Sequence, residues 1–315
     1  MSSPRRRPRE PEDAPAATVA DHPPARTALL ATGWRAVKVL YGAEVPALRE
    51  LTETLTSDGR LRHVELTLEL PGLPAALDGL RIGHVTDLHF GRRARHLDAL
   101  TAWTRSVTVD LWAVTGDLLE STAGLPAAET LTEALEAPLG RWFVAGNNDN
   151  RLLPVLGGLK PVLEPMGFRV LDNEGTVTEH GGRRLALAGV DDPTRFRDDL
   201  RSAVSRLEAE PFLLLLAHSP GVVFRETALP PNLVLAGHTH GGQICLPRIG
   251  PLIGRTRQPG CGRRMAAGLF QRGNSIVYVS RGIGTSILPI RVFCPPEVTT
   301  LTLRSAPGEV RRDAR

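Results

Sequence analysis

The stretch Leu235-Ala-Gly-His-Thr-His-Gly-Gly-Gln243 places two imidazoles, those of His238 and His240, directly after a run of apolar residues. A short apolar run of this kind is typical of a buried strand. Residues i and i+2 of a continuing strand share a face, so both imidazoles can point toward one site. Imidazole is a common metal ligand, so the stretch indicates a metal site at a strand end. The motif alone leaves a pair of ordinary loop histidines as an equal alternative.

The same pattern, an apolar run followed by polar residues, occurs four more times. The runs are 80–86 before Asp87 and His89, 110–115 before Asp117, 141–145 before Asn147, and 211–217 before His218. Helical patterns are expected at about 97–107, 127–135 and 197–209, and further strands at 63–70, 184–190, 275–280 and 298–303. Strands alternating with helices predict βαβ units with polar residues at the carboxyl ends of the strands.

The chain has 315 residues, 42% of them hydrophobic, and can bury a large core. We expect a disordered, basic and proline-rich tail over 1–26, a helical extension over 27–60, a main α/β domain over 61–306 and a loose tail over 307–315. The extension either lies at a membrane interface as an amphipathic helix or packs against the main domain, and a charge interrupts it too early for a membrane span.

The overall composition gives weaker indications. Basic and acidic residues are nearly balanced, 38 against 34, which gives slight support to an anionic substrate or an anionic membrane surface. Nucleic acid is disfavoured because only 4% of the residues are aromatic. Three cysteines at spacings that fit no disulfide framework favour a reducing compartment. We therefore expect a cytoplasmic protein, or one peripheral at the inner face of a membrane.

Polar residues at the predicted strand ends form one candidate site. They are Asp87, His89, Asp117, Asn147, His218, His238 and His240. Seven oxygen and nitrogen donors exceed the needs of one tetrahedral zinc and suit two divalent ions, such as Mn, Fe, Co or Zn. Two ions about 3.5–4 Å apart can clamp a phosphate and turn a bridging water into hydroxide near neutral pH. The sequence thus predicts hydrolysis of a phosphate ester or anhydride, with Asp117 as the carboxylate shared by both ions.

These motifs, in this order, resemble the signature of the calcineurin-like metallophosphoesterases over about residues 80–305. Gly237-His-Thr-His-Gly-Gly-Gln243, Arg281-Gly-Ile-Gly-Thr285 and Pro289-Ile-Arg291 are similar, more narrowly, to the bacterial YaeI/YkuE branch. The resemblance implies two facing mixed β-sheets flanked by helices, a four-layer α/β/β/α sandwich, so that 61–306 is the metallophosphoesterase domain. It also implies two metal ions, with Mn the first candidate.

The resemblance further implies how the ligands divide between the two ions. Asp87, His89 and His240 would bind one ion and Asn147, His218 and His238 the other, with Asp117 between them.

One position departs from the family pattern. Many members have Gly-Asn-His-Asp/Glu, whereas this chain has Gly146-Asn147-Asn148-Asp149. An amide cannot act as a general acid at neutral pH. We interpret Asn148 as a hydrogen-bond donor to the phosphate in a working enzyme that prefers diesters or anhydrides with good leaving groups. The alternative is a catalytically impaired, metal-binding scaffold.

The resemblance to the YaeI/YkuE branch also suggests a substrate class. One candidate is a nucleotide-lipid such as UDP-2,3-diacylglucosamine, which would bring a peripheral membrane or lipid contact with it. The arginines of 248–264 either cover an anionic substrate or lie in a solvated loop. No protein partner can be inferred. His84 is expected to pack in the sheet, and Asp191 and Asp192 to cap or orient their neighbours.

Overall fold

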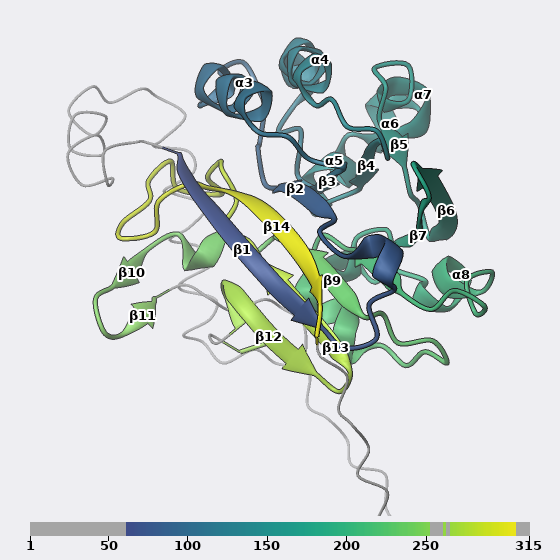
Figure 1. Ribbon diagram of the computed structural model, residues 1–315. Helices are drawn as coiled ribbons and strands as arrows, with labels where there is room; N and C mark the ends of the chain where they lie inside the picture. The colour runs from purple at the N-terminus through teal and green to yellow at the C-terminus, as the bar shows by residue number, and fades with distance from the viewer. Residues whose placement is uncertain (1–60, 253–260, 263–264, 307–315) are drawn as a thin grey trace, which may run out of the picture. The chain divides into compact units, whose positions relative to one another are not determined.

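The structure, a computed structural model, describes residues 61–252, 261–262 and 265–306, all of which belong to the compact unit Ala47–Arg315. The tails and the helical extension expected at 1–26, 27–60 and 307–315 lie outside the described residues. Two six-stranded mixed sheets face each other, with helices on the outer face of each (Figure 1). The predicted fold class is confirmed.

The first sheet carries the strands that precede the earliest motifs. Its order is β1 (Arg62–Leu70), β14 (Glu297–Ser305), β2 (Arg81–Val85), β3 (Leu111–Thr115), β4 (Arg141–Val144) and β5 (Arg169–Val170). The strands β2, β3, β4 and β5 run parallel, and β14 runs antiparallel to β2. The carboxyl ends of β2, β3 and β4 therefore meet at one edge of this sheet.

The second sheet carries the later motifs. Its order is β12 (Gly268–Arg272), β13 (Ser275–Val279), β9 (Leu233–Ala236), β8 (Leu213–Leu216), β7 (Arg183–Gly189) and β6 (Glu174–His180). The strands β7, β8, β9 and β13 are parallel, and the outer two are antiparallel to their neighbours. A short hairpin, β10 (Cys245–Leu246) and β11 (Gly250–Pro251), follows the His238–His240 motif.

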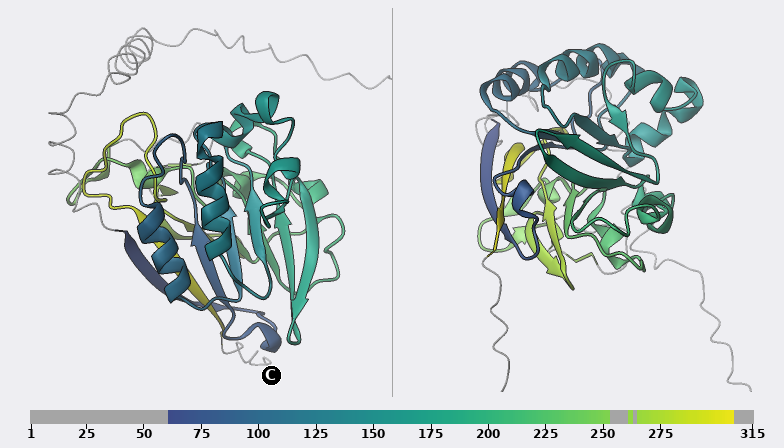
Figure 2. Two further views of the ribbon diagram at one scale, coloured as in Figure 1. Left: turned by 90° about the horizontal axis from the view of Figure 1, so that it is seen from above. Right: turned by 45° about the vertical axis from the view of Figure 1, so that its right-hand side comes forward.

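Three hydrophobic cores lie between the layers. Along β3, Leu111 and Ala113 face the core between the two sheets, while Trp112 and Val114 face the helices on the outer side. Those helices are α3 (Leu97–Ser106) and α4 (Leu125–Ala134), which lie side by side over the first sheet (Figure 2). The outer face of the second sheet packs on α8 (Leu200–Val204) and η4 (Pro220–Phe224). Buried strands with two covered faces explain the nearly continuous apolar runs.

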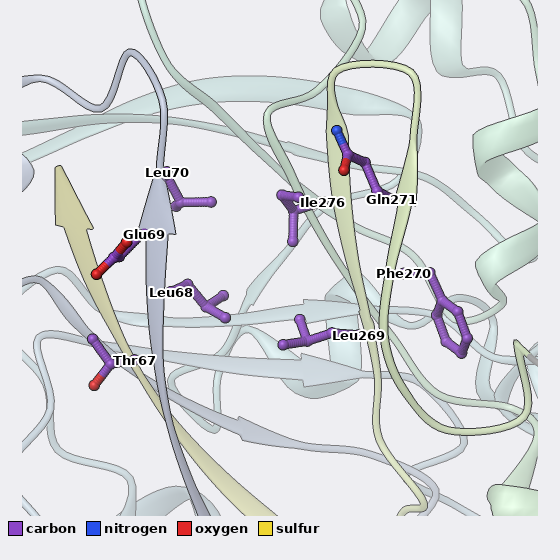
Figure 3. A pocket seen from close by; sticks show the side chains of 8 residues that line it. All are labelled: Thr67, Leu68, Glu69, Leu70, Leu269, Phe270, Gln271 and Ile276. Carbon is purple, nitrogen blue, oxygen red and sulfur yellow. The ribbon is translucent and has the colours of Figure 1, made fainter. Parts of the chain in front are cut away.

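The strand β1 shows the alternation that its sequence predicts. Leu68 and Leu70 are buried, whereas Thr67 and Glu69 are exposed. Figure 3 shows the two leucines pointing toward Leu269 and the strand residue Ile276. The space between them is an apolar pocket of about 380 Å³ at the edge of the sandwich, between β1 and β12, and it contains none of the predicted metal ligands.

Some elements differ from expectation. The helix expected at 197–209 is shorter, because Asp199 accepts the N–H of Ser202 and starts the helix at Leu200, and turns follow Val204. Short helices not anticipated are α5 (Asn147–Arg151), α6 (Leu153–Leu156) and α7 (Lys160–Leu163). The 3-10 turns are η1 (Ala75–Leu77), η2 (Thr122–Gly124), η3 (Pro193–Arg195) and η5 (His240–Gly242). Within the described part of the chain, no helix is long and apolar enough to cross a bilayer.

Candidate metal centre

The predicted ligands lie immediately after five strands of the two sheets. Asp87 and His89 follow β2, Asp117 follows β3 and Asn147 follows β4, while His218 follows β8 and His238 and His240 follow β9. Backbone hydrogen bonds tie these strand ends together within each sheet, from Asp87 N to Gly116 O (3.0 Å) and from Gly237 N to His218 O (2.9 Å). The parallel order thus places residues far apart in the sequence at one site.

In the part of the chain that the structure describes, two groups of donor atoms are close enough to hold a cation. One consists of Asp87, His89 and His240, and the other of Asp87, Asp117 and His218, with the donor atoms of each group within 4.8 Å of one another. In the first group, His240 Nε2 is 3.2 Å from His89 Nε2 and 3.4 Å from Asp87 Oδ1. Asp87, which the family resemblance assigns to one ion, belongs to both groups.

The Asp117 carboxylate lies between the histidines of the two groups. Its Oδ2 is 3.5 Å from His89 Nε2 and also 3.5 Å from His218 Nε2. His238 Nδ1 is 3.1 Å from His218 Nε2, so the imidazole of His238 lies next to the second group. One carboxylate therefore reaches both sets of donors.

A second observation, the hydrogen bonding of the donor atoms, supports the binding of divalent cations. Four buried side-chain polar atoms among the described residues have no hydrogen-bond partner, and two of them are Asp87 Oδ1 and Asn147 Oδ1. A buried oxygen without a partner is unfavourable by about 1–3 kcal/mol. A cation bound to these oxygens would remove that penalty, and the all-nitrogen-and-oxygen donor set suits divalent ions of borderline hardness.

The outer nitrogens of two imidazoles fix the direction of the inner ones. His218 Nδ1 is 2.9 Å from Thr115 O, and a carbonyl only accepts, so Nδ1 carries a proton and Nε2 faces Asp117. His89 Nδ1 is 3.1 Å from Glu120 Oε2, which fixes that ring in the same way. Such outer partners orient metal ligands and strengthen their binding. The sequence reasoning did not find Glu120, because no motif marks a partner three residues after Asp117.

The backbone is unusual at five of the seven predicted ligands. Asp87, His89, Asp117, His238 and His240 have φ between 50° and 70°, the left-handed region that side chains other than glycine rarely adopt. Such conformations are unfavourable by about 1–3 kcal/mol each and cluster at functional sites. The fold holds these side chains in place against a local preference.

Close backbone approach explains one glycine of the motifs. A Cβ on Gly237 would lie 2.2 Å from Thr86 Oγ1 and 2.4 Å from Asp87 Oδ2. Any side chain at this position would push Asp87 away from the site. The close approach of Thr86 and Asp87 therefore requires a glycine before His238.

Charges in the site shift several pKa values strongly. Burial by itself lowers the pKa of His218, but the charge of Asp117 and its hydrogen bond outweigh burial and raise the pKa to about 10. Burial would raise the pKa of Asp117, yet His218 and His89 hold it below its usual range. Burial and the charge of His218 lower the pKa of His238 to about 3. Without a cation, the surroundings therefore favour a proton on His218 beside Asp117, and a cation that binds there must displace that proton.

Asn148 contacts the predicted bridging carboxylate directly. Its Nδ2 donates to Asp117 Oδ2, and its backbone N–H donates to Asp117 Oδ1 (2.7 Å). The guanidinium of Arg151 donates to Asn148 Oδ1 and lies 3.6 Å from Glu120 Oε1. Arg151 is a second residue that the sequence reasoning missed, although its position three residues after Asn148 on α5 places both on one face.

The remaining expectations agree with the structure where it describes them. His84 is buried, and its Nε2 is 2.8 Å from Thr115 Oγ1 within the sheet. Asp192 caps η3 by accepting the N–H of Thr194, and Asp191 accepts from Asn150 and Arg197. Neither aspartate belongs to the two donor groups.

Residues 80–242 match the family model of the calcineurin-like phosphoesterases. That segment contains all seven predicted ligands. The chain belongs to the calcineurin-like phosphoesterase family. As a member of this family, it is a phosphoesterase hydrolase that uses divalent metal ions, and the predicted family and enzyme class are confirmed.

Relatives place this calcineurin-like phosphoesterase in the expected branch. It is 32% identical to the metallophosphoesterase YkuE of Bacillus subtilis (strain 168) over 256 residues, which are 78% of this chain and 86% of that protein. It is 37% identical to the phosphodiesterase YaeI of Escherichia coli (strain K12) over 143 residues, 45% of this chain and 49% of that protein. It is 28% identical to a transmembrane protein with metallophosphoesterase domain of Danio rerio over 260 residues, 77% of this chain and 57% of that protein.

Proposed function

We propose that this protein is a dinuclear metal-dependent phosphodiesterase that hydrolyses phosphodiester or pyrophosphate bonds. The observation that carries the proposal is the position of Asp117 Oδ2, 3.5 Å from a histidine nitrogen of each donor group. Asp87, His89 and His240 would hold one ion, and Asn147, His218 and His238 the other, with Asp117 between them. Asp87 belongs to both donor groups, so its carboxylate would lie close to both ions when they are bound.

The ions, when bound, supply Lewis acidity to the phosphoryl group and lower the pKa of a water so that it can attack phosphorus near neutral pH. The chain's part is to hold and orient. Glu120 and Thr115 fix the rings of His89 and His218, and the neutral imidazoles of His238 and His240 keep their lone pairs available. We propose Mn as the first candidate for the metal, with Fe, Zn and Co as alternatives.

Asn148 and Arg151 set the preference among substrates. The Asn148 amide lies at the edge of the donor groups, where it can donate a hydrogen bond to a phosphate oxygen but cannot protonate a leaving group. Arg151 brings a fixed positive charge, and its side chain is 41% exposed. The Arg151 guanidinium balances negative charge but does not give up a proton. Such a site favours diesters and anhydrides whose leaving groups depart as anions.

We further propose that the substrate is carried by a lipid, with UDP-2,3-diacylglucosamine as one example, and that the protein works peripherally at the inner face of a membrane. The name of the Danio rerio relative joins a metallophosphoesterase domain to a transmembrane protein, which supports a membrane setting. The name of YaeI supports the phosphodiesterase reaction.

The test compares diester and monoester hydrolysis. Metal-stripped protein is reloaded with Mn, and turnover of bis-p-nitrophenyl phosphate and of p-nitrophenyl phosphate is measured for wild type and Asp117→Ala. The proposal expects metal-dependent diester turnover that the substitution abolishes. Two bound metals without turnover of either ester would contradict the proposal and favour the catalytically impaired scaffold.

A further inference from the structure

Acidic residues are unevenly distributed along the chain. The 70 residues from Thr227 to Pro296 contain eight arginines and neither aspartate nor glutamate. An even distribution of the 34 acidic residues over 315 positions would place seven or eight of them there. This segment includes His238 and His240, so a stretch of sequence without acidic residues contains two of the predicted metal ligands.

Exposed hydrophobic side chains gather in the same segment. Eight large hydrophobic residues are exposed among the described residues, and five of them lie on the β10–β11 hairpin or on the loop 285–293. We call these five the apolar rim: Leu246, Ile249, Leu252, Ile287 and Phe293. Hairpin and loop lie on the same side of the described structure in Figure 1 and in the left view of Figure 2. Exposed apolar groups collected in one place mark an interaction surface.

Hydrogen bonds join the rim to the metal centre. The hairpin and the loop are bonded to each other, from Cys245 N to Val292 O (2.9 Å) and from Val292 N to Gln243 O (2.9 Å). Gln243 also bonds back to His240 O through its own N–H (2.9 Å), and its side chain donates to Leu288 O (2.6 Å). The rim therefore has a fixed position beside a predicted metal ligand.

The backbone holds rim residues outward in a strained form. Ile287 and Phe293 have φ of 65° and 49°, and Arg248 at the tip of the hairpin has φ of 67°. A β-branched residue in the left-handed region is a true outlier. Ile287 is 62% exposed and Phe293 is 65% exposed, so no contact within the described residues explains why these side chains point to solvent.

We propose that the apolar rim binds the surface of an anionic lipid bilayer. Aliphatic side chains would enter the region of the acyl chains, while arginines such as Arg248, which is exposed, bind the headgroup phosphates. A nucleic acid would need stacking aromatics, and Phe293 is the one aromatic among five rim residues. The apolar rim gives the membrane contact of the proposed function a location, and that the phosphoester reaches the metal centre from this membrane rests on the proposed function. Binding of the rim to the bilayer is tested without the phosphoesterase reaction.

Flotation with lipid vesicles tests the rim. The full chain is mixed with vesicles of phosphatidylcholine, with or without phosphatidylglycerol, and the floating fraction is measured for wild type and for Ile249→Ser/Phe293→Ser. Wild type is expected to prefer the anionic vesicles and to release them as the salt concentration rises. The double variant is expected to lose about tenfold or more in partition, because two apolar side chains no longer enter the membrane.

Val155→Ser/Phe196→Ser is the matched control. Phe196 is 72% exposed with φ of 56° and Val155 is 74% exposed, yet both lie outside the segment 227–296 that contains no acidic residue. This variant should float like wild type. Equal flotation of all three proteins, no flotation of wild type, or preference of wild type for a single-stranded oligonucleotide over anionic vesicles would each overturn the proposal.

Hydrolysis of the water-soluble bis-p-nitrophenyl phosphate is measured on the same proteins. Unchanged turnover in the rim variant shows that it is folded and has an intact centre. Absence of turnover in wild type would contradict the proposed function, while the flotation result would still decide the rim.

Discussion

Removing the Asp149 carboxylate should loosen the metal centre without removing a ligand. Asp149 is fully buried, and its two oxygens accept N–H groups from two of the loops that carry predicted ligands. Oδ1 accepts from Leu119 (2.9 Å), after β3, and Oδ2 accepts from Gly146 (2.9 Å), after β4, with a longer contact to Leu118 (3.4 Å). One side chain thus clamps the loop of Asp117 to the loop of Asn147.

The expected loss follows from these bonds. Asp149→Ala removes the acceptor of the Leu119 and Gly146 N–H groups as well as the longer bond from Leu118. The two short bonds alone, at about 1–3 kcal/mol each, should lower the free energy of unfolding by about 2–6 kcal/mol. Asp149→Asn keeps one acceptor. Burial and the charge of Asp117 raise the pKa of Asp149 to about 7, so the amide also removes an unfavourable charge. We therefore expect Asp149→Asn to lose less, about 1–3 kcal/mol.

Urea unfolding of the metal-free protein at neutral pH measures the effect. With a slope of about 2–3 kcal/mol per molar urea, a loss of 3 kcal/mol moves the midpoint by about 1 M. The affinity for Mn, measured by titration, should fall about 10- to 100-fold because the loops of Asp117 and Asn147 are no longer held together. If Asp149→Ala unfolds within about 0.5 kcal/mol of wild type and binds Mn equally well, the carboxylate is not a clamp and the reasoning is wrong.

Three further predictions concern the site and the core. Asp117→Asn should lower bis-p-nitrophenyl phosphate turnover about 100-fold or more and reduce the bound metal from two ions per chain, as measured by elemental analysis; full metal content with full turnover would contradict the bridging role. Arg151→Ala should lower the same turnover about tenfold and Arg151→Lys should restore part of it, whereas equal rates in all three proteins would remove Arg151 from the site. Burial lowers the pKa of His84 to about 3, while the unfolded imidazole titrates near 6.5, so only the unfolded chain takes up this proton between those values and stability falls as pH falls. Between pH 7.5 and 5, His84→Gln should lose about 2 kcal/mol less unfolding free energy than wild type, and an identical pH dependence of the two proteins would refute this.

The sequence predicts the strands and the order of the ligands because both are local signals. A strand such as β8 is covered on both faces and therefore reads as an unbroken apolar run, and His218 lies two residues after its end. The alternating pattern of 63–70 likewise predicts β1. By contrast, β6 is half exposed and short of apolar residues, and no comparable signal marks it.

Long-range pairing and backbone conformation are not visible in the same way. Nothing in the residues of β14 specifies that this strand enters the sheet between β1 and β2. The left-handed φ of Asp87 and the clamp made by Asp149 depend on neighbours that the fold brings from other strands. Asn148 was recognised only because it departs from a family pattern, and its contact with Asp117 required the structure.

The place of β14 has a consequence for the newly made chain. Its nine residues pair along the whole of β1, from Arg62 with Glu297 to Leu70 with Ser305, and among the described strands β1 has no other neighbour in its sheet. At about 5–20 residues per second, a ribosome needs roughly 10–50 s to make the residues that separate the two strands. Through that time β1 has no partner strand, and the Leu68 and Leu70 side chains lack the finished core that buries them. Chaperone dependence during synthesis should therefore fall in a circular permutant that places β14 directly before β1.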